Sequence, residues 1–238
     1  MLSPYGLDIV ENCLTCKLRE DKIFCNLPPK AVQALTAIKY TTVYPKDAQL
    51  FVEGQSPRGI FILCSGRVKL SIGSSDGRML ILKIVEPGEV LGLSATVSGK
   101  PYELTAETMG PSQVNFVKRD DFLRFLREHN EVCLRVAEQL SDKYNTVCRE
   151  IRSLGLSHSA AEKLARLLLE WSEKQRNKQQ PDRIKLTLTQ EQIAQLIGTS
   201  RETVTRLFTD FKKKQLIQVK GSTLVIRNKA ALETMVNP

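Results

Sequence analysis

No apolar segment of this 238-residue sequence is long enough to cross a bilayer. Its first residues lack the positively charged and then apolar pattern of a secretory signal peptide. The sequence also has no glycine-rich phosphate loop, no histidine cluster with zinc spacing, and no nucleophile beside a motif-placed base. The only two histidines, His129 and His158, have no companions at ligand spacing, and we interpret both as surface or helix-terminal residues. We therefore expect a cytoplasmic protein that is neither an enzyme nor a membrane protein.

Positive charge is plentiful but unevenly distributed. The chain is longer than a usual single domain, which favours two domains. Its net charge is +9; residues 153–238 contain 15 Lys and Arg against 8 Asp and Glu, whereas residues 1–152 contain 20 against 18. Because contacts to phosphates supply much of the affinity for nucleic acids, this imbalance predicts that the C-terminal part binds one.

The stretch from Thr189 to Lys213 has the pattern of two short helices around a tight turn. Thr189 and Gln192 fit a capping box that begins the first helix, and Gly198 ends it. Ser200 is a good N-cap for the second helix. This layout is typical of a helix-turn-helix, in which the second helix enters a DNA groove.

The second predicted helix has one apolar and one polar face. Spacing of i, i+3, i+4 and i+7 places four apolar side chains on one stripe, namely Val204, Leu207, Phe208 and Phe211. The first two turns of the opposite face carry the residues expected to reach base edges, namely Arg201, Glu202, Thr205 and Arg206. Alternatively, Glu202 and Arg206 form only a solvated i,i+4 ion pair. We favour base contacts, because the segments on either side complete a DNA-binding module.

These segments predict a winged helix-turn-helix. A helix over His158–Gln175, a polar loop over Asn177–Asp182 and a strand over Ile184–Leu188 come before the two-helix motif. After it, residues 216–219 and 223–226 alternate around Lys220-Gly221 and predict a hairpin. Four lysines would face phosphates or simply be solvated, namely Lys212, Lys213, Lys214 and Lys220.

Three cysteines near the N-terminus form the most unusual local feature, with the spacing Cys13-x2-Cys16-x8-Cys25. In a reducing compartment, cysteines are more often thiols or metal ligands than disulfides. Three thiols so close in sequence can bind a soft metal or an iron–sulfur cluster. The fourth ligand is missing locally, and the remaining thiols are Cys64, Cys133 and Cys148. The alternative is three free thiols in a loose N-terminal arm.

Residues 27–118 are expected to form an antiparallel, jelly-roll-like β domain. A short helix follows Pro28-Pro29, and strands are predicted over Ile60–Cys64, Val68–Ile72, Met79–Val85 and Gln113–Val117. Such a β-roll can enclose a small ligand or have a filled core.

A long helix is predicted from Arg119 to Leu156, ending at Gly155 in a hinge. Its heptad seam predicts a parallel homodimer and comprises Cys133, Ala137, Leu140, Tyr144, Val147, Ile151 and Leu154. The alternative is that the stripe packs on its own β domain. The expected α+β architecture is a cysteine-containing arm (1–26), a sensor β-roll (27–118), a dimerisation helix (119–154) and a winged helix-turn-helix (155–238).

From about Leu27 onward, this order of parts and the string Gly198-Thr199-Ser200-Arg201-Glu202-Thr203-Val204 resemble the Crp/Fnr transcription regulators. The resemblance implies that Arg201, Glu202 and Arg206 recognise a guanine-containing palindrome in double-stranded DNA, with Thr205 at a position that varies. It also implies DNA bending and contact with RNA polymerase. The complete set of expected DNA contacts is Thr199, Ser200, Arg201, Glu202, Thr205, Arg206 and Lys213.

The resemblance is informative about the signal too. Residues that contact cyclic AMP in family members correspond to Leu93, Glu103 and Leu104, with no Arg to neutralise a phosphate, which argues against cyclic AMP. The three N-terminal cysteines instead resemble the oxygen-sensing Fnr branch, which holds a [4Fe–4S] cluster with a fourth cysteine in the β-roll. That position falls near Gln113-Val114, so Cys64, a non-cysteine ligand or water would take its place, or no cluster forms.

The leading hypothesis is thus a homodimeric DNA-binding regulator whose N-terminal thiols report redox state, oxygen or nitric oxide. One alternative is the same regulator controlled by an organic effector in the β-roll. Another is a zinc-stapled protein that binds nucleic acid nonspecifically.

Overall fold

The computed structural model describes residues 4–19, 24–155, 159–175 and 183–236. They fall into two compact units, Met1–Cys148 and Arg149–Pro238. The expected polar loop Asn177–Asp182, residue His158 and the end of the expected hinge at Leu156 lie outside the described residues. Within the described part of the chain, no helix is both long and apolar enough to span a membrane.

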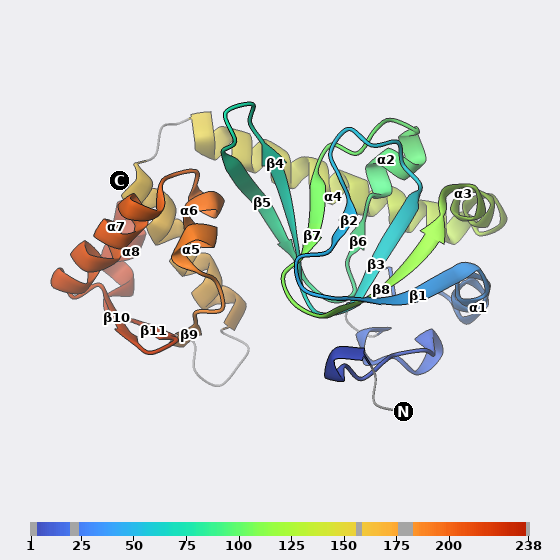
Figure 1. Ribbon diagram of the computed structural model, residues 1–238, viewed down its shortest axis with the longest axis horizontal. Coiled ribbons are helices and arrows are strands. Elements are labelled where there is room, and N and C mark those ends of the chain that lie inside the picture. The colour runs from blue at the N-terminus through green and yellow to red at the C-terminus, as the bar shows by residue number, and fades with distance from the viewer. Residues whose placement is uncertain (1–3, 20–23, 156–158, 176–182, 237–238) are drawn as a thin grey trace. The chain divides into compact units, whose positions relative to one another are not determined.

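The first unit is a β-roll of two four-stranded antiparallel sheets (Figure 1). The first sheet has the order β1 (Lys39–Tyr44), β8 (Ser112–Lys118), β3 (Gly59–Ser65), β6 (Val90–Leu91). The second has the order β2 (Gln49–Phe51), β7 (Thr105–Thr108), β4 (Val68–Gly73), β5 (Met79–Val85). The expected strands are confirmed in β3, β4, β5 and β8, whereas β1, β2, β6 and β7 were not predicted.

Strand β3 shows how the first sheet separates two cores. Its side chains alternate between the two faces, as the pleat of a strand requires. Phe61 and Leu63 point into the roll, where they join a cluster with residues of the second sheet. Ile60 and Ile62 point outward and pack with helices and with Phe24 at the end of the N-terminal arm. The outer face of this sheet is therefore also a packed surface.

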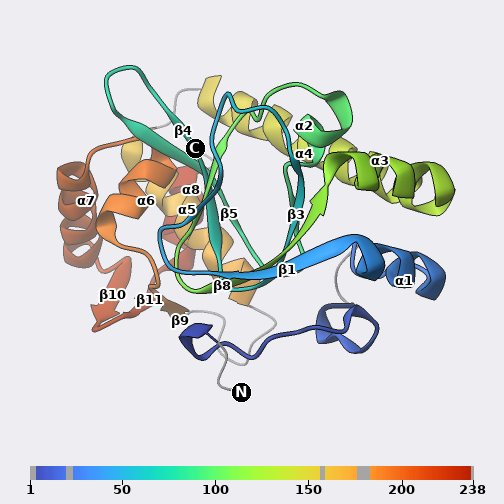
Figure 2. The ribbon, with the colours of Figure 1, turned by 45° about the vertical axis from the view of Figure 1, so that its right-hand side comes forward.

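Helices of the first unit cover this outer face and the ends of the roll. They are α1 (Pro29–Ile38), α2 (Leu93–Ser98), α3 (Arg119–Glu128) and α4 (Asn130–Gly155), with short 3-10 helices η1 (Pro4–Gly6), η2 (Cys13–Thr15) and η3 (Lys17–Arg19) in the arm. Helix α1 confirms the prediction after Pro28-Pro29. Figures 1 and 2 both show the blue N-terminal arm alongside the sheet that contains β1 and β8.

The prediction of a single long helix from Arg119 is wrong, because the helix is interrupted at His129. His129 has non-helical dihedrals (φ −131°, ψ 82°) and its N–H closes α3 on the Phe125 carbonyl. Its ring packs against that of Phe125, with 4.8 Å between centroids, and Nδ1 lies 3.3 Å from a carboxylate oxygen of Glu131. Helix α4 then begins at Asn130.

Helix α4 uses one side for the β-roll and leaves another uncovered. Val132 and Val136 are buried, and Leu140 packs against the same core. Leu134, Tyr144 and Val147 are 64%, 70% and 49% exposed, and Ala137 and Cys133 are exposed too. The predicted seam is therefore mixed: Leu140 packs on its own β domain, while Ala137, Tyr144 and Val147 stay available. The side chains of Ile151 and Leu154 lie outside the described residues.

The second unit is a helical module with a small sheet. Its elements are α5 (Ala160–Gln175), β9 (Arg183–Lys185), α6 (Gln190–Ile197), α7 (Arg201–Lys213), β10 (Ile217–Lys220), β11 (Thr223–Ile226) and α8 (Lys229–Val236). The sheet has the order β10-β11-β9 and confirms the predicted hairpin, with Gly221 in a left-handed turn (φ 56°). Helix α8, which contributes the buried Leu232 to the core, was not predicted.

Candidate nucleic-acid interface and cysteine site

Helices α6 and α7 and the turn between them are delimited by three local capping features. Thr189 and Gln192 form the predicted capping box, with reciprocal hydrogen bonds of 2.9 and 3.2 Å. Gly198 ends α6 in the left-handed conformation (φ 65°), which glycine adopts without steric cost. The Ser200 hydroxyl then accepts the N–H of Thr203 at 3.2 Å and begins α7. Sequence and structure agree here residue by residue.

Helix α7 separates its two faces sharply. Val204, Phe208 and Phe211 are buried in the core of the unit. The predicted contact residues lie on the other side, where the exposed ones are Ser200, Arg201, Glu202, Thr205, Arg206 and Lys213, and Thr199 is half-buried. The fold therefore brings these side chains together on one surface of a helix whose position is fixed by its aromatic residues.

Polar contacts on this surface leave the guanidinium groups accessible. Arg206 donates one hydrogen bond, to the Thr203 hydroxyl at 3.3 Å. Among the described residues, Arg206 and Glu202 do not form an ion pair. The pKa of Glu202 is lowered, first by its own backbone N–H and then by the Ser200 hydroxyl and the charges of Arg201 and Arg206. Glu202 is therefore held as an anion, which accepts but does not donate hydrogen bonds.

All four lysines expected at phosphates are exposed, and one of them is paired within the protein. Lys212 and Lys213 are exposed in the last turn of α7, and Lys220 is exposed at the tip of the β10–β11 hairpin. Lys214 instead pairs with Asp210 at 2.9 Å. Thr205, one of the expected base contacts, also has a partner within the protein, because its hydroxyl donates to the side-chain oxygen of Gln190 at 2.7 Å. That bond links α7 to the start of α6.

The N-terminal arm is held against the first sheet, contrary to the alternative of a loose arm. The buried Gln113 side chain on β8 accepts the N–H of Val10 at 2.8 Å and donates to its carbonyl at 2.7 Å. Lys39 donates to the Glu11 carbonyl at 2.8 Å and to the Cys13 sulfur at 3.3 Å. The bonds between Gln113 and Val10 span about a hundred positions, so local sequence patterns do not reveal them.

The Cys64 thiol on β3 is the fourth cysteine of the proposed set. Burial, together with smaller effects of Cys13, Cys25 and Cys16, raises the pKa of Cys64 to about 12, and Lys39 acts in the opposite direction. None of the six cysteines, all of them among the described residues, forms a disulfide.

The described residues contain no group of three or more His, Cys, Asp or Glu side chains that is close enough to hold a metal ion. By donor chemistry the set still fits an iron–sulfur cluster, which is bound by four Cys thiolates, and it equally fits zinc. Cys133 and Cys148 belong elsewhere. Both are exposed on α4, and the Cys133 thiol donates to the Leu126 carbonyl at 3.0 Å.

The region expected to bind an effector contains a cation that the sequence did not suggest. Lys143 of α4 places Nζ 3.4 Å from the Val90 carbonyl. Its pKa is lowered by burial and by Lys83, whereas Glu89 and Glu103 act in the opposite direction. Leu93 is fully buried, and Glu103 is exposed and accepts from Ser94 at 3.0 Å. No arginine stands at these positions.

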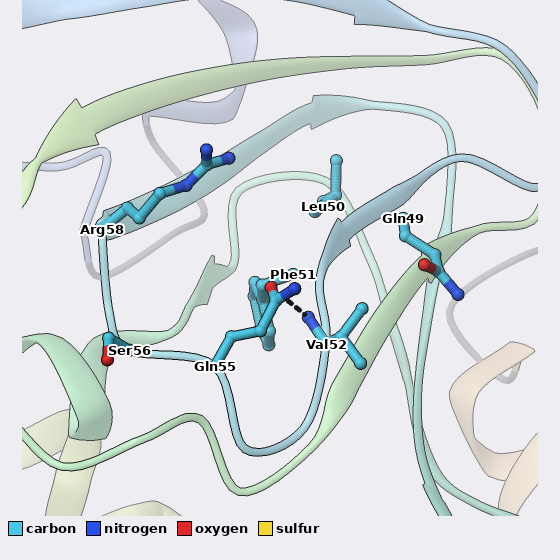
Figure 3. A pocket seen from close by; sticks show the side chains of 7 residues that line it. All are labelled: Gln49, Leu50, Phe51, Val52, Gln55, Ser56 and Arg58. Atoms are coloured by element: carbon cyan, nitrogen blue, oxygen red, sulfur yellow. Dashed lines mark hydrogen bonds between the residues drawn. The ribbon is translucent and has the colours of Figure 1, made fainter.

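A hollow lies at the surface beside β2 (Figure 3). Its lining is mixed, comprising Gln49, Leu50, Phe51, Val52, Gln55, Ser56 and Arg58. The Gln55 side chain bends back to accept the N–H of Val52 at 3.2 Å. None of the predicted site residues lines it.

Known proteins resemble both units. A family model described as a cyclic nucleotide-binding domain matches residues 41–129, and one described as a Crp-like helix-turn-helix domain matches residues 162–235. A CRP-like cAMP-activated global transcriptional regulator of Mycobacterium tuberculosis is 26% identical over 212 residues, which cover 88% of this chain and 94% of the relative.

Solved structures also resemble this chain over most of its length. FixK2 from Bradyrhizobium japonicum is 25% identical, with a TM-score of 0.67, covering 83% of this chain and 97% of that one. The c-di-GMP responsive global regulator CLP of Xanthomonas campestris has a TM-score of 0.74 and covers 84% and 99%; at 18% identity it shows the fold alone.

A β-roll of the cyclic nucleotide-binding class together with a helix-turn-helix defines a DNA-binding transcription regulator. The two family models together match more than half of the sequence, and relatives and solved structures point to the same group. The chain belongs to the Crp/Fnr family.

Proposed function

We propose that this regulator binds a two-fold-symmetric DNA site as a homodimer, with one copy of α7 in each of two successive major grooves. The exposed polar face of α7 carries this proposal, because Arg201, Glu202 and Arg206 lie together on one face of a helix whose opposite face is buried. Arg is suited to guanine O6 and N7, and Glu to cytosine N4. The exposed side of α4, with Leu134, Tyr144 and Val147, supplies apolar surface for the dimer.

Selection from a random duplex pool tests the DNA proposal. Purified protein should enrich a palindrome whose half-sites are about 34 Å apart, one turn of the double helix. Enrichment of no sequence, or of a single asymmetric half-site, contradicts it. Contact with RNA polymerase, expected from the family, is tested separately by transcription from the selected site.

For the signal, we propose an iron–sulfur cluster held by the N-terminal thiols. The cysteine-rich arm, which lies fixed on the β-roll through Val10 and Lys39, supports this assignment. Such a cluster would supply a centre that oxygen or nitric oxide can oxidise or dismantle. The side chains of Gln113 and Lys39 hold the arm on the sheet. A change at the thiols would alter how two α4 helices pair, and so the separation of the two copies of α7.

Metal and sulfide analysis of protein purified under nitrogen tests this signal. A brown protein with iron and acid-labile sulfide supports the cluster. A colourless protein with stoichiometric zinc supports a zinc staple instead.

The second candidate is a small organic effector in the β-roll. The charged group around Lys143, where α4 meets β6, favours it, and relatives are described as cAMP-activated. Cyclic AMP itself is disfavoured, because Leu93, Glu103 and Leu104 offer no arginine to its phosphate. Protein that contains neither metal nor sulfide but changes its DNA affinity with an extracted small molecule supports this candidate.

A further inference from the structure

A side-chain hydrogen bond joins the start of α6 to the exposed face of α7. The Thr205 hydroxyl lies 2.7 Å from Oε1 of Gln190, the first residue of α6. Both residues are exposed. The capping box of α6 uses the side chains of Thr189 and Gln192, which leaves that of Gln190 to reach α7. Gln190 therefore lies beside the surface assigned to the DNA groove, although no local pattern in the sequence marks it.

The hydroxyl hydrogen of Thr205 has acceptors within the protein. Besides Gln190, the hydroxyl lies 3.0 Å from the backbone carbonyl of Arg201, one turn earlier in α7. A threonine hydroxyl has a single hydrogen to donate. If the oxygen of the Gln190 amide faces Thr205, that oxygen takes the hydrogen; if the amide is turned and its NH2 group donates to Thr205, the Arg201 carbonyl takes it. In both orientations Thr205 has no hydrogen left to donate to a base.

These contacts also orient the Thr205 side chain. In helices, threonine divides between two χ1 rotamers, because its hydroxyl can bond a carbonyl of the preceding turn. In α7 that bond and the contact with Gln190 hold the oxygen toward the helix backbone and α6. The side chain has only one other heavy atom beyond Cβ, the γ-methyl group. By elimination, the methyl group is what Thr205 offers to a groove.

A methyl group can distinguish one base from the others in the major groove. Thymine is the base that carries a methyl group there, and the methyl group of threonine is one of the apolar groups that contact it. A hydroxyl free to donate would instead suit the acceptors guanine O6 and N7 or thymine O4. The bonds that occupy the Thr205 hydroxyl therefore favour recognition of the thymine methyl group.

We propose that Gln190 determines base specificity indirectly: it holds the Thr205 hydroxyl, so that the Thr205 methyl group contacts a thymine in each half-site. Gln190 is thus a positioning residue, and Thr205 is the residue that touches the base. This inference rests on the proposed docking of α7 in the major groove. It adds a thymine to the guanine expected from the arginines.

Deoxyuridine tests the contact with unaltered protein, because it differs from thymidine only in lacking the methyl group. Each thymine of the selected palindrome is replaced in turn, symmetrically in both half-sites, and Kd is measured by fluorescence anisotropy. At one position the replacement should weaken binding roughly fourfold per half-site and roughly 15-fold per dimer, as expected for the loss of one buried methyl group. If no replacement weakens binding, the inference is overturned, whereas the enriched palindrome still supports the docking of α7.

Two variants of Thr205 separate its methyl group from its hydroxyl. Thr205→Val keeps a methyl group without the hydroxyl, and should retain the penalty for deoxyuridine. Thr205→Ser keeps the hydroxyl without the methyl group, and should bind the thymine and deoxyuridine duplexes equally. Any other pattern shows that Thr205 does not recognise the base through its methyl group and overturns the inference.

Variants of Gln190 test its positioning role. Gln190→Ala should lose most of the penalty for deoxyuridine and keep its guanine preference, because only the Thr205 side chain is released. Gln190→Glu keeps an acceptor for the hydroxyl and should retain the penalty, although its added negative charge weakens binding to every duplex. Gln195→Ala is the matched control, because Gln195 lies on the same helix but contacts Glu191 at 3.5 Å; it should bind as wild type does.

The outcomes distinguish this inference from the proposed function. If Gln190→Ala keeps the full penalty for deoxyuridine, Gln190 does not position Thr205 and the inference is overturned, while the docking of α7 stands. A selection that enriches no palindrome overturns the proposed function and this inference together.

Discussion

Replacing Arg206 by alanine should weaken specific DNA binding strongly while leaving the fold intact. The Arg206 side chain is exposed and makes one internal hydrogen bond, to the Thr203 hydroxyl at 3.3 Å. Surface changes of this kind alter the free energy of unfolding by about 0.5 kcal/mol or less. The reduction in DNA binding is larger, because a bidentate arginine–guanine pair discriminates by about 1–3 kcal/mol.

A dimer of the variant presents two copies of the substitution to one palindromic site. If the half-sites contribute independently, Arg206→Ala costs about 2–6 kcal/mol per dimer, equivalent to roughly a 30-fold to 20,000-fold increase in Kd. Fluorescence anisotropy with a labelled duplex carrying the selected site, at fixed salt, measures this change. The same titration on duplexes altered at one base pair reports which position loses its preference.

Lys229→Ala is the matched control, because it also removes one positive charge but lies on α8, where Lys229 pairs with Glu233 at 3.7 Å. It should leave base preference unchanged. If Arg206→Ala folds normally and binds the selected and altered duplexes as wild type does, Arg206 does not contact a base and the assignment of this face to the groove is refuted.

Three further changes test other parts of the molecule. Lys213→Ala should weaken binding equally on selected and random duplexes and reduce the slope of log K against log salt by about 0.9 for each phosphate that the lysine neutralises; a change confined to one sequence contradicts this. Phe211→Ala should destabilise the DNA-binding unit by roughly 3–5 kcal/mol in urea denaturation, because its side chain is fully buried; a cost below about 1 kcal/mol means that the core is not as described. Lys143 has a pKa that is lower in the folded than in the unfolded chain, so the folded state binds fewer protons. The free energy of unfolding should therefore increase as pH rises from the folded pKa toward the unfolded value of about 10.4. Plots of the free energy of unfolding against pH for wild type and Lys143→Met should converge over that window, and parallel plots contradict the prediction.

Helix α7 and its turn were predictable because their determinants are local. Thr189, Gly198 and Ser200 each act within four residues of their position, and the stripe ending at Phe211 has plain helical spacing. Such signals do not depend on distant parts of the chain.

The break before α4 and strands such as β1 were missed because contacts beyond the local pattern determine them. Lys39 to Tyr44 become a strand by pairing with β8, more than 60 residues away. His129 interrupts a pattern that is otherwise helical, and its backbone dihedrals, not its sequence neighbours, reveal the break.

The proposed cysteine site lies between these cases. The spacing of Cys13, Cys16 and Cys25 predicts a ligand set, but the register shift of β3 at Cys64 and the hydrogen bonds between Gln113 and Val10 arise only in the folded sheet. Neither feature has a signature in the residues around it.

Methylation interference on the selected site tests the central claim most directly, because guanine N7 lies in the major groove. With wild-type protein, methylation of guanines should block binding in two symmetric clusters about 34 Å apart, and Arg206→Ala should weaken the effect at its own guanine in both. Interference confined to one cluster, or no interference at any guanine, contradicts the docking of two copies of α7 in successive major grooves.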